Sequence, residues 1–215
     1  MLKLNDLTVK IGSIRILSDI NLKISDFSSI VGRNGAGKTT LVRSIMGALP
    51  LESGSIEFNG RKISDLKPFM ISNLGIGYMP EDRRLVPDLT VKENILIPLW
   101  SKKKYLNDEG KLEKVLDFIP EIKVFLDRGA FQLSGGQQKL VALARAMIAG
   151  NKLLLLDEPF EGVAPALAER LVEVIKSLSK LNLLTLITES DQLYSKKINA
   201  NIIKIERGKI FSNFD

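Results

Sequence analysis

The sequence predicts an α/β fold in which helices flank a mainly parallel sheet. Short apolar runs bounded by turn residues alternate with segments of helical spacing along most of the 215 residues. A glycine-rich loop follows one buried run, and an acidic pair ends another. This alternation is typical of βαβ connections in one chain. No internal repeat is present, so we expect a single domain over residues 1–215.

The first part of the chain alternates apolar and polar residues in segments 2–4, 7–11 and 20–24. This period of two predicts an antiparallel subdomain at one edge of the core. Residues 28–31 form a short buried strand that leads into the glycine loop, and Thr40 to Leu49 has helical spacing. Turn residues enclose a strand at 56–58.

The middle of the chain, from Thr90 to about Asp127, is helical and dense in charge. We therefore expect an inserted helical lobe at about 85–138, with the core formed by about 1–84 and 139–215. The later expected elements are a helix at 137–149, a buried strand at 153–156, a helix at 167–178, a buried strand at 183–188, and a hairpin of 202–205 with 209–211.

The composition excludes several classes of function. The chain has no cysteine and no histidine, so thiolate or imidazole metal sites and histidine-based catalysis are impossible. No apolar run reaches the ~18 residues of a membrane span, and the first residues lack the apolar core of a signal peptide, so we expect a cytosolic location.

The net charge of +6 is densest at Lys102, Lys103 and Lys104. A basic chain can bind nucleic acid or an anionic membrane, but aromatic residues do not alternate with these lysines as in base-stacking surfaces. A solvated lysine-rich face is the favoured interpretation, and we expect no nucleic-acid partner.

The glycine loop matches the pattern G-x-x-x-x-G-K-[ST], between a strand and a helix. In this pattern the backbone N–H groups surround phosphates, the lysine reaches the β- and γ-phosphates, and the threonine binds Mg²⁺. An ordinary glycine turn is the alternative, which the strand–loop–helix context disfavours. The expected binding residues are Gly32, Arg33, Asn34, Gly35, Ala36, Gly37, Lys38, Thr39 and Thr40.

An acidic pair, Asp157 and Glu158, follows four consecutive leucines. It therefore lies at the carboxyl end of a buried strand, where open α/β sheets bind ligands. Consecutive strand residues point to opposite sides. We expect Asp157 to face the metal and Glu158 to face an attacking water.

A second anion-binding motif lies about a hundred residues after the first. Ser134, Gly135, Gly136 and Gln137 directly precede a helical pattern, so their backbone N–H groups stand at a helix N-terminus. Phosphate loop, Ser-Gly-Gly-Gln and acidic strand end occur in the order found in ATP-binding cassette (ABC) ATPases. The chain resembles this family from about Leu2 to Ile210.

The resemblance implies a P-loop fold and a head-to-tail pair of cassettes. ATP would lie between the phosphate loop of one chain and the serine and glycines of the other, whether identical or paralogous. Glu158 is similar to the family's catalytic glutamate, with Lys38 as a second catalytic group. ATP and Mg²⁺ are the implied ligands.

Finer features resemble the ATPase subunits of branched-chain amino acid and urea importers. Glu81 stands where most cassettes have glutamine, and Ala164 where many have aspartate. Glu81 is expected to contact both nucleotide and metal. This branch implies membrane permease subunits as partners, an indirect extracellular or periplasmic solute-binding protein, and a position on the inner face of the cell membrane.

Two departures leave alternatives open. Ile11 falls where many cassettes stack an aromatic residue on adenine, and Ser190 falls where a histidine contacts the γ-phosphate. Ser190 is therefore a candidate catalytic residue with a shorter, uncharged side chain. Together with Ala164 these departures suggest an ATP-binding switch with weak turnover, and a cassette of another transporter branch, such as lipid or lipopolysaccharide export, is a further alternative. A nucleic-acid-associated cassette is suggested only by the basic charge, and the chain has neither the second cassette nor the coiled-coil insertion that such proteins usually carry.

Overall fold

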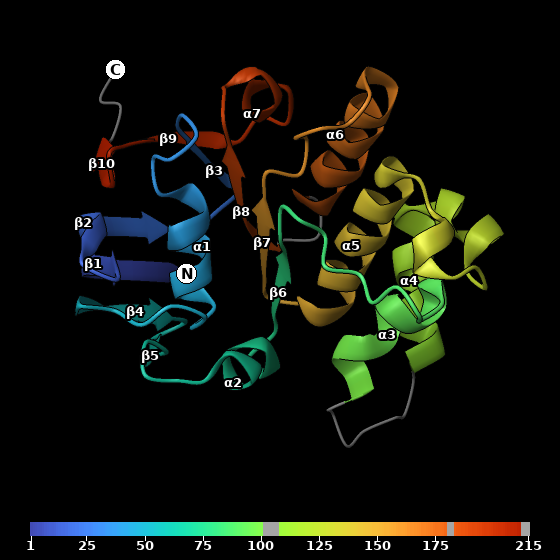
Figure 1. The fold of residues 1–215 in the computed structure, drawn as a ribbon, viewed down its shortest axis with the longest axis horizontal. Helices are drawn as coiled ribbons and strands as arrows, with labels where there is room; N and C mark the ends of the chain where they lie inside the picture. Colours follow the sequence, from blue (N-terminus) through green and yellow to red (C-terminus); the bar gives the residue numbers. More distant parts are fainter. Residues whose placement is uncertain (101–107, 180–182, 212–215) are drawn as a thin grey trace.

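The structure, a computed structural model, describes residues 1–100, 108–179 and 183–211. The expected lysine-rich face at Lys102 to Lys104 lies outside the described residues. Figure 1 shows two sheets side by side, with a group of helices beyond the second sheet. Within the described ranges, no helix is both long and apolar enough to cross a membrane.

The smaller sheet is antiparallel and has the strand order β2-β1-β4-β5. Its strands are β1 (Leu2–Ile11), β2 (Ile14–Ile24), β4 (Ser53–Phe58) and β5 (Arg61–Lys62). The sequence predicted two separate strands where β1 runs without a break. Asp6 has a φ of 47°, and the register shifts at this point, so the apolar alternation resumes out of phase.

The larger sheet has the order β10-β9-β3-β8-β7-β6. All its neighbouring strands are parallel except β9 and β10, which confirms the mainly parallel α/β fold. Helices and the smaller sheet cover its two faces, so its central strands are apolar along most of their length. The strands are β3 (Ser28–Val31), β6 (Ile76–Met79), β7 (Leu153–Asp157), β8 (Leu184–Glu189), β9 (Asn201–Glu206) and β10 (Lys209–Phe211).

The helices agree with the predicted segments except at some boundaries. The first helix ends at Ile45, and not at Leu49, because Gly47 takes a left-handed φ of 68°. The short helix α2 was not predicted, since Pro68 begins only six helical residues. The helices are α1 (Lys38–Ile45), α2 (Pro68–Asn73), α3 (Val91–Trp100), α4 (Asp108–Phe118), α5 (Gly135–Ala149), α6 (Pro165–Ser179) and α7 (Leu193–Lys197), with 3₁₀ turns at Pro120–Phe125 and Ala130–Gln132.

Two hydrophobic cores lie on the two faces of the parallel sheet. Along β7, Leu153 and Leu155 pack with α1 and the antiparallel strands, whereas Leu154 and Leu156 pack with α3, α5 and α6. Helix α5 crosses the expected boundary at residue 138 without a break. It therefore joins the expected lobe to the core, and the division into these two parts stays a prediction.

Candidate functional site

The glycine loop connects β3 to α1, and its local geometry requires glycine at two positions. A Cβ on Gly32 would lie 2.3 Å from the carbonyl oxygen of Ile205. Gly37 caps α1 with a φ of 106°, a conformation that side-chain-bearing residues rarely adopt. The loop backbone can therefore present its N–H groups at the start of a helix, where an anion is stabilised.

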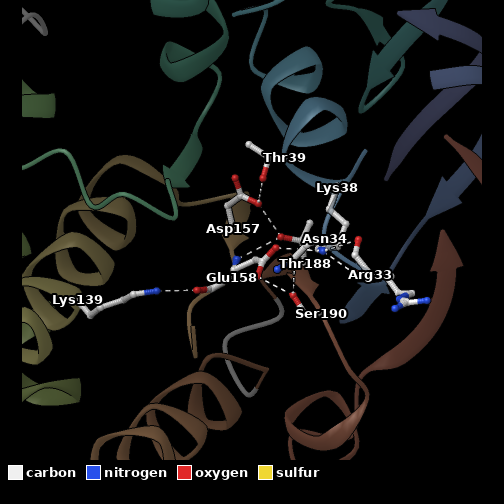
Figure 2. Close-up of polar contacts among 10 residues, drawn as sticks. Arg33, Asn34, Lys38, Thr39, Lys139, Asp157, Glu158, Thr188 and Ser190 are labelled. Atoms are coloured by element: carbon white, nitrogen blue, oxygen red, sulfur yellow. Dashed lines mark hydrogen bonds and ion pairs between the residues drawn. The ribbon is translucent and has the colours of Figure 1, made fainter. Parts of the chain in front are cut away.

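Lys38 is the first residue of α1, and its side chain is only 3% exposed. Its Nζ donates to the carbonyl oxygen of Gly32 at 2.6 Å and lies 3.1 Å from Oε1 of Glu158. Figure 2 shows Lys38 curling back over the loop toward Glu158. The predicted phosphate-binding lysine and the predicted catalytic glutamate are thus in direct contact.

Asp157 ends β7 and is fully buried among hydrogen-bond donors. Its Oδ1 accepts from Thr188 Oγ1 at 2.7 Å and from Thr39 Oγ1 at 3.2 Å, and its Oδ2 accepts from Tyr78 at 3.2 Å. Desolvation by burial raises the pKa of Asp157, and these hydrogen bonds act in the opposite direction. Burial, together with the same contact with Asp157, raises the pKa of Tyr78.

The side chain of Glu158 faces the glycine loop, but the backbone geometry that directs it there differs from the prediction. It lies after β7, not within it, and has a left-handed φ of 47°. Its N–H donates to the carbonyl oxygen of Thr188 at 3.1 Å, which anchors the turn to β8. A left-handed residue, and not strand alternation, therefore separates the directions of the Asp157 and Glu158 side chains.

Ser190 directly follows β8 and lies beside Glu158. Its hydroxyl lies 2.9 Å from Oε2 of Glu158 and 2.9 Å from Oδ1 of Asn34. Figure 2 shows Ser190 between the strand end and the glycine loop. The structure therefore places Ser190 next to both the glycine loop and Glu158, and its catalytic role stays a prediction.

An open pocket of about 460 Å³ lies along the loop. Its wall includes Glu81, and burial followed by the charges of Glu158 and Asp157 raises the pKa of Glu81. Ile16, and not Ile11, supplies the aliphatic side chain of this pocket. The lining residues are Ile16, Asn34, Gly35, Gly37, Lys38, Thr39, Thr40, Glu81, Glu158 and Glu161.

The Ser-Gly-Gly-Gln motif lies apart from this pocket, at the N-terminus of α5. Ser134 is exposed and caps the helix, with its Oγ accepting from the Gln137 N–H at 3.3 Å, while Gln137 Oε1 accepts from the Ser134 N–H at 3.0 Å. None of Ser134 to Gln137 lines the phosphate-loop pocket of the same chain. The order of the motifs in the sequence could not decide whether Ser134 to Gln137 line the pocket of their own chain.

Several polar residues around the site were not predicted. Thr188 and Tyr78 hold Asp157, and Lys139 donates to the Glu158 carbonyl oxygen at 2.6 Å. Arg145 donates to the carbonyl oxygens of Arg83 and Arg84, just after Glu81. The sequence did offer a signal for these residues, because they stand among apolar residues of buried elements. A polar side chain in such a buried position needs a hydrogen-bond partner.

The oxygen donors fit a small divalent cation. Thr39 offers a hydroxyl on the wall of the pocket and donates to the carboxylate of Asp157 behind it, and Glu81 lies on the same wall. Within the described residues, no group of three or more acidic side chains forms a metal site by itself. Mg²⁺ commonly takes one or two protein ligands together with phosphate oxygens and water.

Fold and site together define a nucleotide-binding cassette, and the comparison with known families gives the same answer. Residues 17–161 match the family model described as ABC transporter. The chain belongs to this family.

Individual relatives are transport ATP-binding proteins. The chain is 32% identical to a probable branched-chain amino acid transport ATP-binding protein, LivF, of Archaeoglobus fulgidus, over 91% of this chain and 83% of the relative. It is 31% identical to the high-affinity branched-chain amino acid transport ATP-binding protein BraG of Pseudomonas aeruginosa, over 98% and 91%. The lipopolysaccharide export system ATP-binding protein LptB of Haemophilus influenzae is also 32% identical, over 92% and 83%.

A solved structure shares the fold closely. It is described as the dimeric, post-hydrolysis state of the ATP-binding cassette MJ0796 bound to ADP and Pi, with a TM-score of 0.86 and 26% identity over 99% of this chain and 97% of that one. The chain is thus an ABC transporter ATP-binding subunit, and its family supports ATPase activity.

Proposed function

We propose that this chain hydrolyses ATP with Mg²⁺ to power a membrane importer for a small polar solute, a branched-chain amino acid or a related amide or urea. The observation that carries the proposal is the convergence of Lys38, Thr39, Asp157, Glu158 and Ser190 around one glycine loop. Each is a residue type that suits phosphoryl transfer to water, and they come from the start of one helix and the ends of two strands.

The residues divide the chemical work by position. The loop N–H groups and Lys38 bind the β- and γ-phosphates. When the phosphates bind, Lys38 gives up its contact with Glu158 and contacts phosphate oxygens instead. When bound, Mg²⁺ neutralises charge that develops on the phosphates, and Thr39, Asp157 and Glu81 would hold it. Glu158 orients the attacking water, and the Ser190 hydroxyl holds the carboxylate at 2.9 Å.

The proposed active unit is a head-to-tail pair of cassettes. Ser134, Gly135, Gly136 and Gln137 would contact the ATP held by a partner's loop, which agrees with their position away from this chain's own pocket. The similarity to a dimeric cassette supports the pairing. Nucleotide bridging two chains then shifts the population toward the closed pair.

Membrane permease subunits are the proposed partners, with a solute-binding protein acting through them. The chain would lie peripherally on the cytoplasmic face of the membrane. The similarity to LivF and BraG supports the branched-chain amino acid branch. Export of a lipid or lipopolysaccharide is the second candidate, since the chain is 32% identical to LptB and also 32% identical to LivF. Co-purification with membrane subunits, followed by solute uptake into vesicles, separates the two.

The central test is the ATPase activity of Glu158→Gln. The amide of glutamine has the shape of the carboxylate but activates water less well, so we expect the ATP turnover to fall at least about a hundredfold. The binding of ATP should persist. Turnover at the parent rate would remove Glu158 from its assigned role. Tight ATP binding without turnover in the parent, with partners present, would favour an ATP-binding switch instead.

A further inference from the structure

Lys139 is a lysine buried inside the helix that begins with Ser134. It is 1% exposed, although lysine is among the residues least often fully buried. It lies on the face of α5 that turns toward the end of β7 (Figure 2). Burial of an ammonium group is unfavourable because the group loses its hydration. A side chain held in this way needs a specific contact in return.

The contact is with the backbone of the proposed base. Lys139 Nζ donates to the carbonyl oxygen of Glu158 at 2.6 Å, and Figure 2 shows the extended side chain reaching it from α5. The N–H of the same residue is held by Thr188 of β8. Both peptide groups of Glu158 are therefore fixed, one by the sheet and the other by α5.

The conformation of Glu158 explains why it needs this support. Its φ of 47° is left-handed, a conformation that is unfavourable for a residue with a side chain. A strained backbone persists only where its surroundings hold it. A change of φ at this residue would redirect the carboxylate away from Lys38 and Ser190, which it contacts at 3.1 and 2.9 Å.

Within the described residues Lys139 makes no direct ion pair, and nearby carboxylates offset only part of the cost of burying its charge. Burial, followed by the charge of Arg83, lowers the pKa of Lys139, whereas Glu189, Glu81 and Glu161 act in the opposite direction. The ammonium group is thus oriented by one short hydrogen bond to a carbonyl.

We propose that Lys139 is a positioning residue for ATP hydrolysis: it locks the left-handed turn that aims Glu158 and links that turn to the helix carrying Ser134. Displacement of α5 by a partner's nucleotide would therefore reach the base through one side chain. The inference rests on the proposed function, because it assigns Lys139 a role in the same reaction.

The test compares Lys139→Met, which keeps the length without the donor, with Lys139→Arg, which keeps a cationic donor. For the Met variant we expect kcat to fall about tenfold or more, since small displacements of a reacting group are costly, with unchanged KM for ATP. Its melting temperature should change little, because the desolvation cost of the buried ammonium group disappears together with its hydrogen bond. The Arg variant should recover most of kcat.

A second comparison, made in the Glu158→Gln variant, distinguishes a positioning role of Lys139 from a general loss of structure. In Glu158→Gln, where turnover does not interfere, adding Lys139→Met should leave the ATP affinity unchanged. A Met variant with parental kcat, or one that loses ATP affinity and melting temperature together, overturns the inference. If Lys139→Met does not fold, Lys139→Gln replaces it, and loss of folding in both assigns Lys139 to stability and also overturns the inference.

The parent enzyme distinguishes this inference from the proposed function. A parent with no turnover overturns the proposed function and the role of Lys139 with it. A parent that hydrolyses ATP and loses activity in Glu158→Gln, but not in Lys139→Met, leaves the proposed function intact and overturns only the inference.

Discussion

At the scale of single residues, the site depends on short contacts made by groups that are mostly buried. Lys38, Asp157 and Glu158 are each less than a tenth exposed. A buried charge is tolerated only where partners compensate for lost water. Asp157 therefore has three hydroxyl donors, and Lys38 has both a carbonyl and a carboxylate.

Ser190→Ala tests whether the serine compensates for the absent histidine. The change removes the hydroxyl that contacts both Glu158 and Asn34 at 2.9 Å. We expect kcat to fall roughly tenfold, less than the loss of a full oxyanion-hole donor, because Thr188 and Lys139 still hold the backbone of Glu158. Steady-state ATPase assays measure this change. Ser190→Thr is the control, and parental turnover in Ser190→Ala would leave Ser190 without a role.

Glu189 gives the stability of the chain a dependence on pH. It is 6% exposed, and its Oε1 is a buried polar atom with no hydrogen-bond partner among the described residues. Burial raises its pKa to about 8 from the usual value of 4.5. Between these two values the folded chain holds a proton that the unfolded chain has released, so its free energy of unfolding decreases as pH rises.

Glu189→Gln should remove this decrease. The slope for one proton is at most about 1.4 kcal/mol per pH unit, and the chain has no histidine to obscure it between pH 5 and 8. Urea unfolding at a series of pH values measures the slope. The parent should lose stability from pH 5 to 8 relative to Glu189→Gln. Parallel curves for the two proteins would contradict the assignment.

Residue identity was easier to predict than residue environment. The glycine loop and the acidic pair form patterns that are specific by spacing, so their meeting at the sheet edge could be anticipated. The left-handed turn at Glu158 and the burial of Lys139 could not, because a lysine in an amphipathic helix normally faces solvent. Only tertiary packing decides where that side chain points.

At the scale of elements, strands buried on both faces were the most predictable. Strands β3, β7 and β8 are short buried runs, and each ends where the site begins. The antiparallel sheet was less predictable, since left-handed residues at Asp6 and Asp19 accompany register shifts that interrupt the period of two. Helix α2 has only six residues and begins with a proline, which leaves too little periodicity to detect.

Gly77 shows how close two elements approach behind the site. It lies in β6, and a Cβ there would stand 2.1 Å from the carbonyl oxygen of Ala146 in α5. Gly77→Ala must push α5 from the sheet, so we expect a destabilisation of at least about 1–3 kcal/mol, the usual cost of overpacking. Chemical denaturation measures it.

Gly60→Asn is the control for this substitution. Gly60 also carries no side chain, but its turn is open, with nothing within 4 Å of a Cβ added there, and asparagine tolerates its φ of 80°. We expect a much smaller loss there. Equal effects at both positions would mean that contact between β6 and α5 does not limit stability.

At the scale of the whole molecule, α5 occupies the central position. Its N-cap Ser134 faces solvent, its buried face holds the Glu158 backbone through Lys139, and Arg145 holds the segment after Glu81. The helix α5 therefore begins with the proposed partner-facing motif, and its side chains contact both the proposed catalytic Glu158 and the segment that leads into the expected lobe. Motion of such a rigid element can couple these three places.

The proposed head-to-tail pair predicts complementation between two inactive variants. Lys38→Ala removes the loop lysine but keeps the motif at Ser134, whereas Ser134→Arg blocks that motif but keeps the loop. Each variant alone should be inactive, because every composite site in its dimer lacks one half. A mixed dimer regains one complete site, so an equal mixture should recover up to about a quarter of the parental ATPase activity, given random pairing with twofold symmetry.

The control is an equal mixture of Lys38→Ala with Lys38→Ala/Ser134→Arg, in which no pairing contains a complete site. Activity should remain at background in this mixture at every protein concentration. In the complementing mixture, activity should increase with concentration as dimers form, because each complete site needs two chains. Full activity of Ser134→Arg alone would mean that a single chain completes its own site, and would overturn the head-to-tail assignment.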